Sequence, residues 1–386
     1  MQNTKYSEFN GKLFALFFFQ FSILIPFTQF MDIKILVAFV SGIISLLLLL
    51  KNKILVFKKK VLLLYLCLVL LFLVKYLLGQ ANGEVILFSF AYITPVVWLF
   101  LFPFNRSCCV KAMFFLSKIN FLLLVTLPFT TGLAESYMRF GYGMLPSVIM
   151  SFVELAHYSS EKITTIDLKE KCIEIFDLII ILIGGLEMLI YGARGSTFAF
   201  LLFVVIDYLI FKKVSLLYTC ALFLFSLFLY SNLEFILDYL ELITNRLGIF
   251  SYAIFKFKAQ LMYGFDSASS GRAFLYTHAI NEILQYPIFG GTLSTDEVYV
   301  HNLFLQVGTD FGVFAIIILI LFTLYVLYLI GKKDIVKEEK LLLLIFFSLS
   351  YGRLMFSSTI WQRPEFWILV FFVLSLERYK KTAVNC

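Results

Sequence analysis

Long apolar stretches separated by short polar segments run through the whole chain. Val61 to Val74 and Phe314 to Ile330 lack the polar face of a surface helix, so their surroundings must be apolar on every side. A membrane crossing needs about 17 to 25 apolar residues. The pattern therefore predicts an all-α polytopic membrane protein with about 12 transmembrane helices, near residues 13–30, 33–50, 61–78, 84–103, 112–131, 141–158, 172–191, 196–211, 214–231, 311–330, 341–360 and 365–377.

Composition agrees with this prediction. Of 386 residues, 61% are hydrophobic and 15% are charged, against about 25% charged in a soluble domain. The net charge of +7 comes from basic residues in short loops, without the basic stripe that nucleic-acid binding requires. No spacing of Cys and His resembles a zinc site. We expect no nucleic-acid partner, no metal and no cofactor.

The basic residues are concentrated in every second loop between the predicted spans. Lys and Arg tend to stay cytoplasmic because moving them across the membrane is unfavourable. One set of loops, with both termini, holds 21 of them, against 4 in the short loops opposite and 4 in the long loop. Twelve spans also return the chain to the side on which it began. We therefore expect both termini in the cytoplasm and the long loop outside it, which in a bacterial inner membrane means the periplasm.

The long loop, residues 232–300, divides the chain into spans one to nine (1–231), the loop itself and spans ten to twelve (301–386), which we expect to act as one domain. Apolar and acidic residues fall on opposite faces of residues 233–243, which predicts a helix along the membrane surface. A second helix is expected over 273–285, ended by the proline and glycines that follow. The sequence thus predicts a mostly helical periplasmic loop.

Five arginines lie at or near the predicted extracytoplasmic face, where the insertion bias disfavours them: Arg139, Arg194, Arg272, Arg353 and Arg363. Arg353 is predicted well inside span eleven, so it must face the bundle interior or a water-filled cavity. Guanidinium groups bind phosphate oxygens bidentately and stay charged, so a polyanionic ligand is the simplest account. An ordinary interfacial role is the alternative for Arg194 and Arg363.

The other polar residues near span ends have either a catalytic or a structural expected role. His301 stands at the mouth of a span on the same face, where a histidine can act as general base at neutral pH. Lys75, Lys118, Glu154 and Asp207 lie near span ends, and snorkelling to the interface is the expected, structural role for each.

An ordered set of motifs then carries a family resemblance. Its members are Arg139-Phe140, Gly192-Ala193-Arg194-Gly195-Ser196, Ser270-Gly271-Arg272, Pro287-Ile288-Phe289-Gly290-Gly291, His301-Asn302 and Gly308 to Gly312. In order and spacing, residues 139–330 resemble the O-antigen polymerase and ligase superfamily. Size, hydropathy and the single long loop agree with that resemblance.

The resemblance implies a metal-independent glycosyltransferase acting on a polyprenyl (undecaprenyl) diphosphate-linked oligosaccharide. Arg194 and Arg272 would hold the diphosphate and stabilise its developing charge, joined by Arg139, Arg353 and Arg363 in binding. His301 would activate the acceptor hydroxyl. Two further acidic residues, Asp296 and Glu297, have no family counterpart, so either could be the base instead, and Asn302 could serve only to fix the turn.

Three functions remain open on this evidence. A polymerase would join repeat units of a surface polysaccharide, O-antigen or capsule, and a chain-length regulator and a flippase would be its candidate partners. A ligase would transfer the glycan to lipid A core during lipopolysaccharide synthesis, with the same donor chemistry. A transporter of the lipid-linked oligosaccharide would line a path with the arginines, but no repeat of the motif-bearing half is found. The polymerase is favoured.

Overall fold

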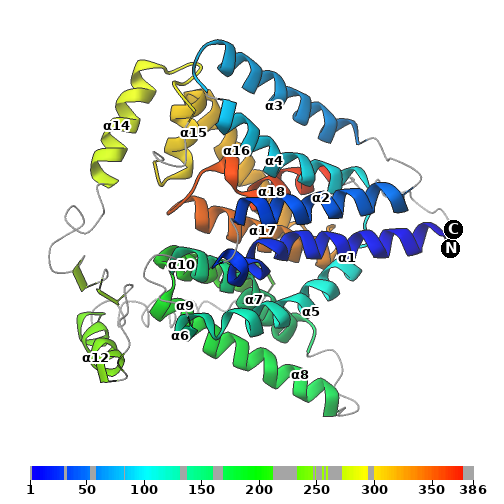
Figure 1. Ribbon diagram of the computed structural model, residues 1–386, viewed down its shortest axis with the longest axis vertical. Helices are drawn as coiled ribbons and strands as arrows, with labels where there is room; N and C mark the ends of the chain where they lie inside the picture. The colour runs from blue at the N-terminus through cyan, green and yellow to red at the C-terminus, as the bar shows by residue number, and fades with distance from the viewer. Residues whose placement is uncertain are drawn as a thin grey trace.

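The chain was analysed as a computed structural model. The structure describes residues 2–29, 33–52, 58–81, 83–130, 137–159, 168–211, 233–246, 248, 254–255, 258–259, 272–293 and 300–376. Within these ranges every regular element is helical, as Figure 1 shows. The prediction of an all-α protein is confirmed for this part of the chain.

The first half of the chain forms the helices from α1 to α10. They are α1 (Gln2–Ile23), the 3-10 helix η1 (Ile25–Gln29), α2 (Ile33–Lys51), α3 (Lys59–Leu77), α4 (Gly83–Leu101), α5 (Arg106–Leu124), α6 (Leu127–Thr130) and α7 (Tyr137–His157). Then come α8 (Leu168–Ile179), a π-helical turn η3 (Ile180–Gly184), α9 (Gly185–Tyr191) and α10 (Arg194–Phe211). Because η3 joins α8 and α9 without a break, this segment is one long helix with a π turn.

The second half contributes α12 (Leu233–Arg246), α14 (Arg272–Gln285), α15 (Leu303–Phe311), α16 (Val313–Gly331), α17 (Lys337–Leu354), the 3-10 helix η4 (Ile360–Gln362) and α18 (Pro364–Ser375). In Figure 1 the first turns of α1 lie at one end of the molecule, while α12 and α14 lie at the opposite end. The sides of the membrane to which these ends belong stay a prediction.

Helix α17 occupies the centre of the bundle. It packs against α10, α18 and α16, while α1 packs on α5 and α5 on α7. Aromatic rings fill the space between α1, α4, α17 and α18, with Phe14 5.4 Å from Phe100, and Phe346 5.6 Å from Phe372 between ring centroids. All four rings are buried. Helix α7 packs on both α1 and α17. The ends of these three helices are therefore fixed relative to one another, and the candidate site is built on those ends.

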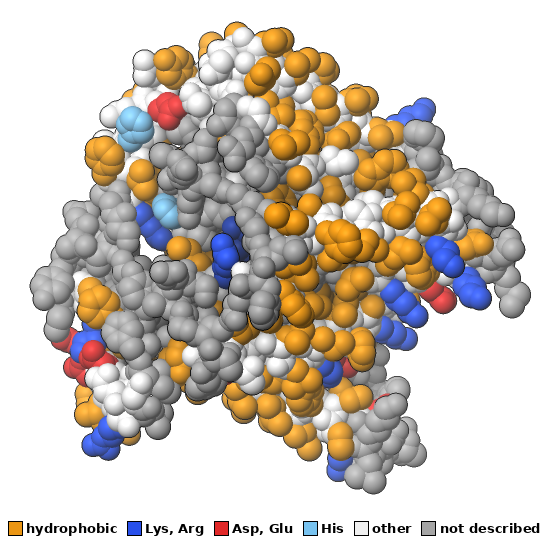
Figure 2. All heavy atoms as spheres, viewed as in Figure 1, with side chains coloured by type: hydrophobic (Ala, Val, Ile, Leu, Met, Phe, Trp, Pro, Cys, Tyr) orange, Lys and Arg blue, Asp and Glu red, His pale blue; other side chains and the backbone are white. Residues whose placement is uncertain are grey.

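Three described helices are long and apolar enough to cross a membrane by length and composition: α3, α5 and α16. Shorter apolar helices include α10 and α18. Hydrophobic side chains are exposed along α3 and α16, and Figure 2 shows such side chains over much of one face of the molecule. Since water would disfavour that surface, the chain is a helical membrane protein.

Helices coincide with eleven of the twelve predicted spans, and the ninth, 214–231, lies outside the described residues. The number of crossings stays a prediction. One boundary was wrong: span eleven was expected to run to residue 360, but α17 ends at Leu354. Arg353 therefore lies in the last turn of α17, not deep within a span. Both helices expected in the long loop are confirmed as α12 and α14.

The expectation that charged residues near span ends reach the interface was wrong for Lys75. Its side chain is buried, and its Nζ donates to the carbonyls of Phe289 at 2.9 Å and Gly291 at 2.7 Å. Nearby, the Leu293 amide donates to the Gln80 carbonyl at 2.9 Å. These carbonyls accept hydrogen bonds from the buried ammonium group. Lys75, near the end of α3, therefore anchors the segment that follows α14.

Replacing Lys75 with methionine is expected to lower the stability of the fold by about 2 kcal/mol, because two buried carbonyls lose a charged donor. Thermal unfolding of the purified protein measures the change. Lys60→Met is the matched control, since Lys60 is exposed at the start of the same helix. Equal melting temperatures for the two variants would contradict the anchoring role.

Candidate functional site

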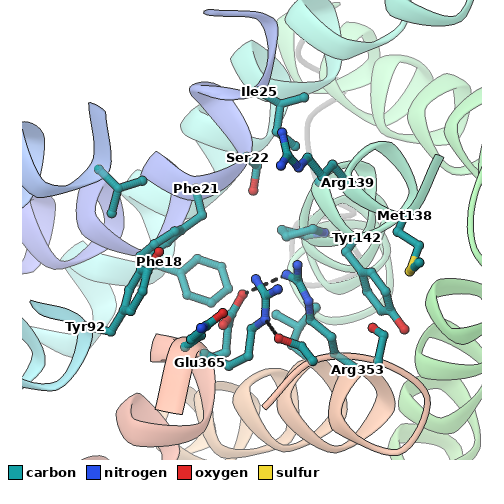
Figure 3. Close-up of a pocket in the computed structure, with 18 residues that line it drawn as sticks. Phe18, Phe21, Ser22, Ile25, Tyr92, Met138, Arg139, Tyr142, Arg353 and Glu365 are labelled. Atoms are coloured by element: carbon teal, nitrogen blue, oxygen red, sulfur yellow. Dashed lines mark hydrogen bonds and ion pairs between the residues drawn. The ribbon is translucent and has the colours of Figure 1, made fainter. Parts of the chain in front are cut away.

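A cavity of about 360 Å³ opens between α1, α2, α4, α7 and α17. One wall is apolar and aromatic, with Phe18 and Phe21 from α1 and Tyr92 from α4. The opposite wall is polar and comes from α7 and from the segment that joins α17 to α18 (Figure 3). The cavity thus presents charge on one side and rings on the other.

Three of the predicted arginines, Arg139, Arg353 and Arg363, line this cavity together. Arg353 Nη1 lies 3.4 Å from Glu365 Oε1, and Arg363 Nε donates to Ser358 Oγ. Arg139 is exposed and has no hydrogen-bond or ion-pair partner among the described residues. With the carboxylate of Glu365, the three guanidinium groups leave the wall a net charge of +2.

The end of α17 explains how these arginines meet. The helix stops at Leu354, and Ser358 has a φ of 73°, a left-handed conformation that few non-glycine residues adopt. Pro364 then starts α18, where its fixed φ suits the first helical turn. This tight connection returns the chain toward α17, so Arg363 and Glu365 face the same space as Arg353.

Arg272 and His301, far apart in the sequence, meet at one backbone oxygen. Arg272 Nη2 donates to the Phe356 carbonyl at 3.2 Å, and His301 Nδ1 lies 3.2 Å from the same oxygen. Phe356 directly precedes the serines that line the cavity. The segment from Phe356 to Ser358 therefore has the loop residues on one side and the cavity on the other.

The contact with Phe356 fixes the tautomer of the neutral His301 ring. Because a carbonyl can only accept, Nδ1 carries the proton and Nε2 carries the lone pair when the ring is neutral. Burial, and then the charge of Arg272, lower the pKa of His301 below its ordinary value, and the hydrogen bond to Phe356 opposes them. His301 is thus a neutral ring at pH 7, able to accept a proton at Nε2.

The structure tests the role expected for Asn302, but it does not test the two alternative bases. Asn302 caps α15, with its side-chain oxygen accepting from the amides of Phe304 at 3.0 Å and Leu305 at 3.1 Å, so its structural role is confirmed. Asp296 and Glu297, the alternative bases, lie outside the described residues.

Arg194 begins α10, but its side chain lies outside what the structure describes. The backbone around it packs closely on the site. A Cβ on Gly195 would come within 2.0 Å of Tyr142 Oη, and one on Gly141 within 2.7 Å of the Ala193 nitrogen. Both glycines are therefore needed where α7 lies close to Ala193 and to the first turn of α10.

Sequence reasoning missed Tyr142 and Glu365. Arg353 lies 4.6 Å from the Tyr142 ring centroid, and both residues line the cavity. Glu365 supplies the carboxylate that lies 3.4 Å from Arg353 Nη1. The position of Tyr142 one turn after Arg139 on α7 was the signal available in the sequence.

No protein-family model matches the chain, and no curated protein matches it. In the part of the chain that the structure describes, no group of three or more His, Cys, Asp or Glu could hold a metal ion.

Proposed function

We propose that the chain is a polymerase of surface-polysaccharide repeat units, which takes its glycan from a polyprenyl diphosphate donor. The observation that carries the proposal is the convergence of Arg139, Arg353 and Arg363 on one cavity. A diphosphate diester carries one negative charge on each phosphate, which matches the net charge of +2 on the cavity wall. Arg272 and His301 beside the cavity supply a further cation and a base.

The proposed reaction uses these groups in order. The arginines bind the diphosphate and stabilise its charge as the bond from the anomeric carbon to the phosphate oxygen breaks. The acceptor hydroxyl of a second lipid-linked unit forms the new bond to that carbon, and His301 Nε2 takes the hydroxyl proton. Polyprenyl diphosphate is the leaving group. Arg194 is retained in the proposal as a further diphosphate ligand, on the resemblance alone.

The proposal includes a setting for the reaction. The chain would lie in a bacterial inner membrane with both termini in the cytoplasm and the site on the periplasmic side. The basic residues of the predicted cytoplasmic loops support this orientation. A flippase would supply the donor and a chain-length regulator would limit the product.

Reconstitution tests the function directly. Purified protein in liposomes is supplied with a lipid-linked repeat unit and a chelator, and glycan length is read on a gel. A ladder of products is expected. A single glycan on added lipid A core, without a ladder, would identify a ligase, and translocation without a new glycosidic bond would identify a transporter. Either result would overturn the polymerase.

The pH dependence of the reaction tests His301. Because its pKa lies below the ordinary value of about 6.5, the base is neutral at pH 7, and kcat/KM is expected to fall only as pH drops below that value. His301→Gln should lower kcat about 100-fold and remove this acid limb. His278→Gln is the control, since His278 is exposed on α14. An unchanged acid limb in His301→Gln would assign the base to another residue.

A further inference from the structure

The charged side chains predicted near span ends are paired within the bundle. Lys118 Nζ of α5 lies 2.6 Å from Glu154 Oε2 of α7. His157 Nε2 of α7 lies 2.8 Å from Asp207 Oδ1 of α10. Snorkelling was therefore the wrong expectation for Lys118, Glu154 and Asp207. These contacts hold the helices of the bundle together.

The end of α14 and the turn that follows it, residues 284–289, form an exposed apolar surface, which we call the apolar turn. Its four large side chains are exposed, and Phe289 is the most exposed of them at 78%: Leu284, Tyr286, Ile288 and Phe289. The sequence from residue 283 to residue 293 contains no charged side chain. An exposed apolar surface of this kind marks a place where lipid or another protein covers the chain.

The backbone of the apolar turn is hydrogen-bonded to the bundle, while its side chains point away from it. The Pro287 carbonyl accepts from the Val313 amide at 2.8 Å, and the Phe289 carbonyl accepts from Lys75 Nζ at 2.9 Å. A backbone carbonyl without a partner is costly in hydrocarbon, so non-helical backbone at membrane depth must be bonded inside the protein. The apolar turn meets this requirement at both carbonyls.

The neighbours of the apolar turn are two helices that are long and apolar enough to cross a membrane, α3 and α16. Figure 1 shows α14 and α15 beside one end of α3. Leu77 and Leu78 at this end of α3 are exposed, and so are Val313 and Phe314 at the start of α16. Because Lys75 and Val313 bind the turn from these two ends, its exposed surface continues the lipid-facing surface of both helices.

Lys75 supports the same location for the turn. A lysine near the end of a span ordinarily reaches water by snorkelling, but this side chain is only 4% exposed. Its Nζ donates to the Gly291 carbonyl at 2.7 Å and lies 5.7 Å from the Phe311 ring centroid. Carbonyl oxygens thus stabilise the ammonium where lipid would not, and the turn covers the charge.

We propose that the apolar turn inserts into the lipid bilayer at its interface, beside the ends of α3 and α16, where acyl chains cover Leu284, Ile288 and Phe289. Tyr286 suits the same boundary, because tyrosine combines an apolar ring with a polar hydroxyl. The turn holds the end of α14, the helix that begins with Arg272, at the membrane surface. The proposal does not depend on the glycosyltransferase function, because it follows from the exposed surface and the backbone contacts of the turn.

The fluorescence of a tryptophan placed on the turn tests the proposal. Phe289→Trp and Ile288→Trp are each reconstituted in liposomes as the full chain, and the signal of the wild type, which has three tryptophans, is subtracted. Lipids with bromine on their acyl chains quench a tryptophan in the bilayer, whereas iodide quenches one in water. We expect bromolipid to quench both variants severalfold more strongly than a tryptophan in water, and iodide to have little effect on them.

Two matched variants define the limits of the measurement. Phe314→Trp lies on the exposed apolar surface of α16 and should respond to bromolipid. His278→Trp, one helical turn from Glu282 on the exposed surface of α14, should respond to iodide. Iodide quenching of Phe289→Trp as strong as that of His278→Trp would place the turn in water and overturn the proposal. Insensitivity of Phe289→Trp and Ile288→Trp to both quenchers would also overturn it, because protein would then cover the turn.

Discussion

The Arg353→Ala variant is expected to transfer glycan about 100-fold to 1,000-fold more slowly than the wild type. Arg353 combines two features that the other cavity arginines do not share: it contacts Glu365 at 3.4 Å and stacks over Tyr142 at 4.6 Å. Its guanidinium is therefore held in position before any anion arrives. Removing it takes away both a charge and a pre-oriented donor.

Three further variants distinguish ligand binding from folding. Arg353→Lys keeps the charge but not the planar pair of donors, so most of the loss should remain. Arg353→Met combined with Glu365→Gln removes both members of the ion pair and restores neutrality, which should recover stability without recovering transfer. Arg246→Ala, on the exposed surface of α12, should behave as wild type. Full activity in Arg353→Ala would show that the cavity is not the donor site.

The Gly312→Ala variant is expected to lose about 3 kcal/mol of stability, through backbone strain and overpacking together. Gly312 joins α15 to α16 with φ 84° and ψ −177°, a conformation essentially restricted to glycine. A Cβ there would lie 2.4 Å from the Pro287 carbonyl oxygen and 2.6 Å from that of Ile288. The substitution should therefore separate the segment after α14 from the bundle.

Limited proteolysis and thermal unfolding measure this effect. Cleavage within residues 286–293 should become faster in Gly312→Ala, and transfer should fall because Arg272 is held by α14. Gly331→Ala at the other end of α16 is the matched control, since no atom lies within 4 Å of the added Cβ. Alanine in a helix is favoured over glycine by about 0.5–1 kcal/mol, so this control should be neutral or slightly stabilising. A stable, protease-resistant Gly312→Ala would contradict the role of Gly312.

The sequence alone determined where the helices form and which residue types carry the site. Apolar runs and helical spacing are local properties, so they predicted the helices near the spans and the two helices of the loop, α12 and α14. The same local reasoning selected the arginines, because an arginine at or near the extracytoplasmic ends of the spans is unfavourable whatever residues pack beside it. Asn302 was also open to prediction, because a capping side chain acts within three residues.

Only the tertiary structure decided which of these residues meet. Arg139 and Arg353 share a cavity because α7 and α17, which are distant in sequence, pack in one bundle. In addition, α17 ends at Leu354, six residues before the end of the predicted span at 360. Arg272 and His301 converge on Phe356 for the same kind of reason. Glu365 contacts Arg353 because α18 packs on α17. Hydrophobicity along a chain specifies burial, but it does not specify which buried faces touch, and charge chemistry depends on that contact.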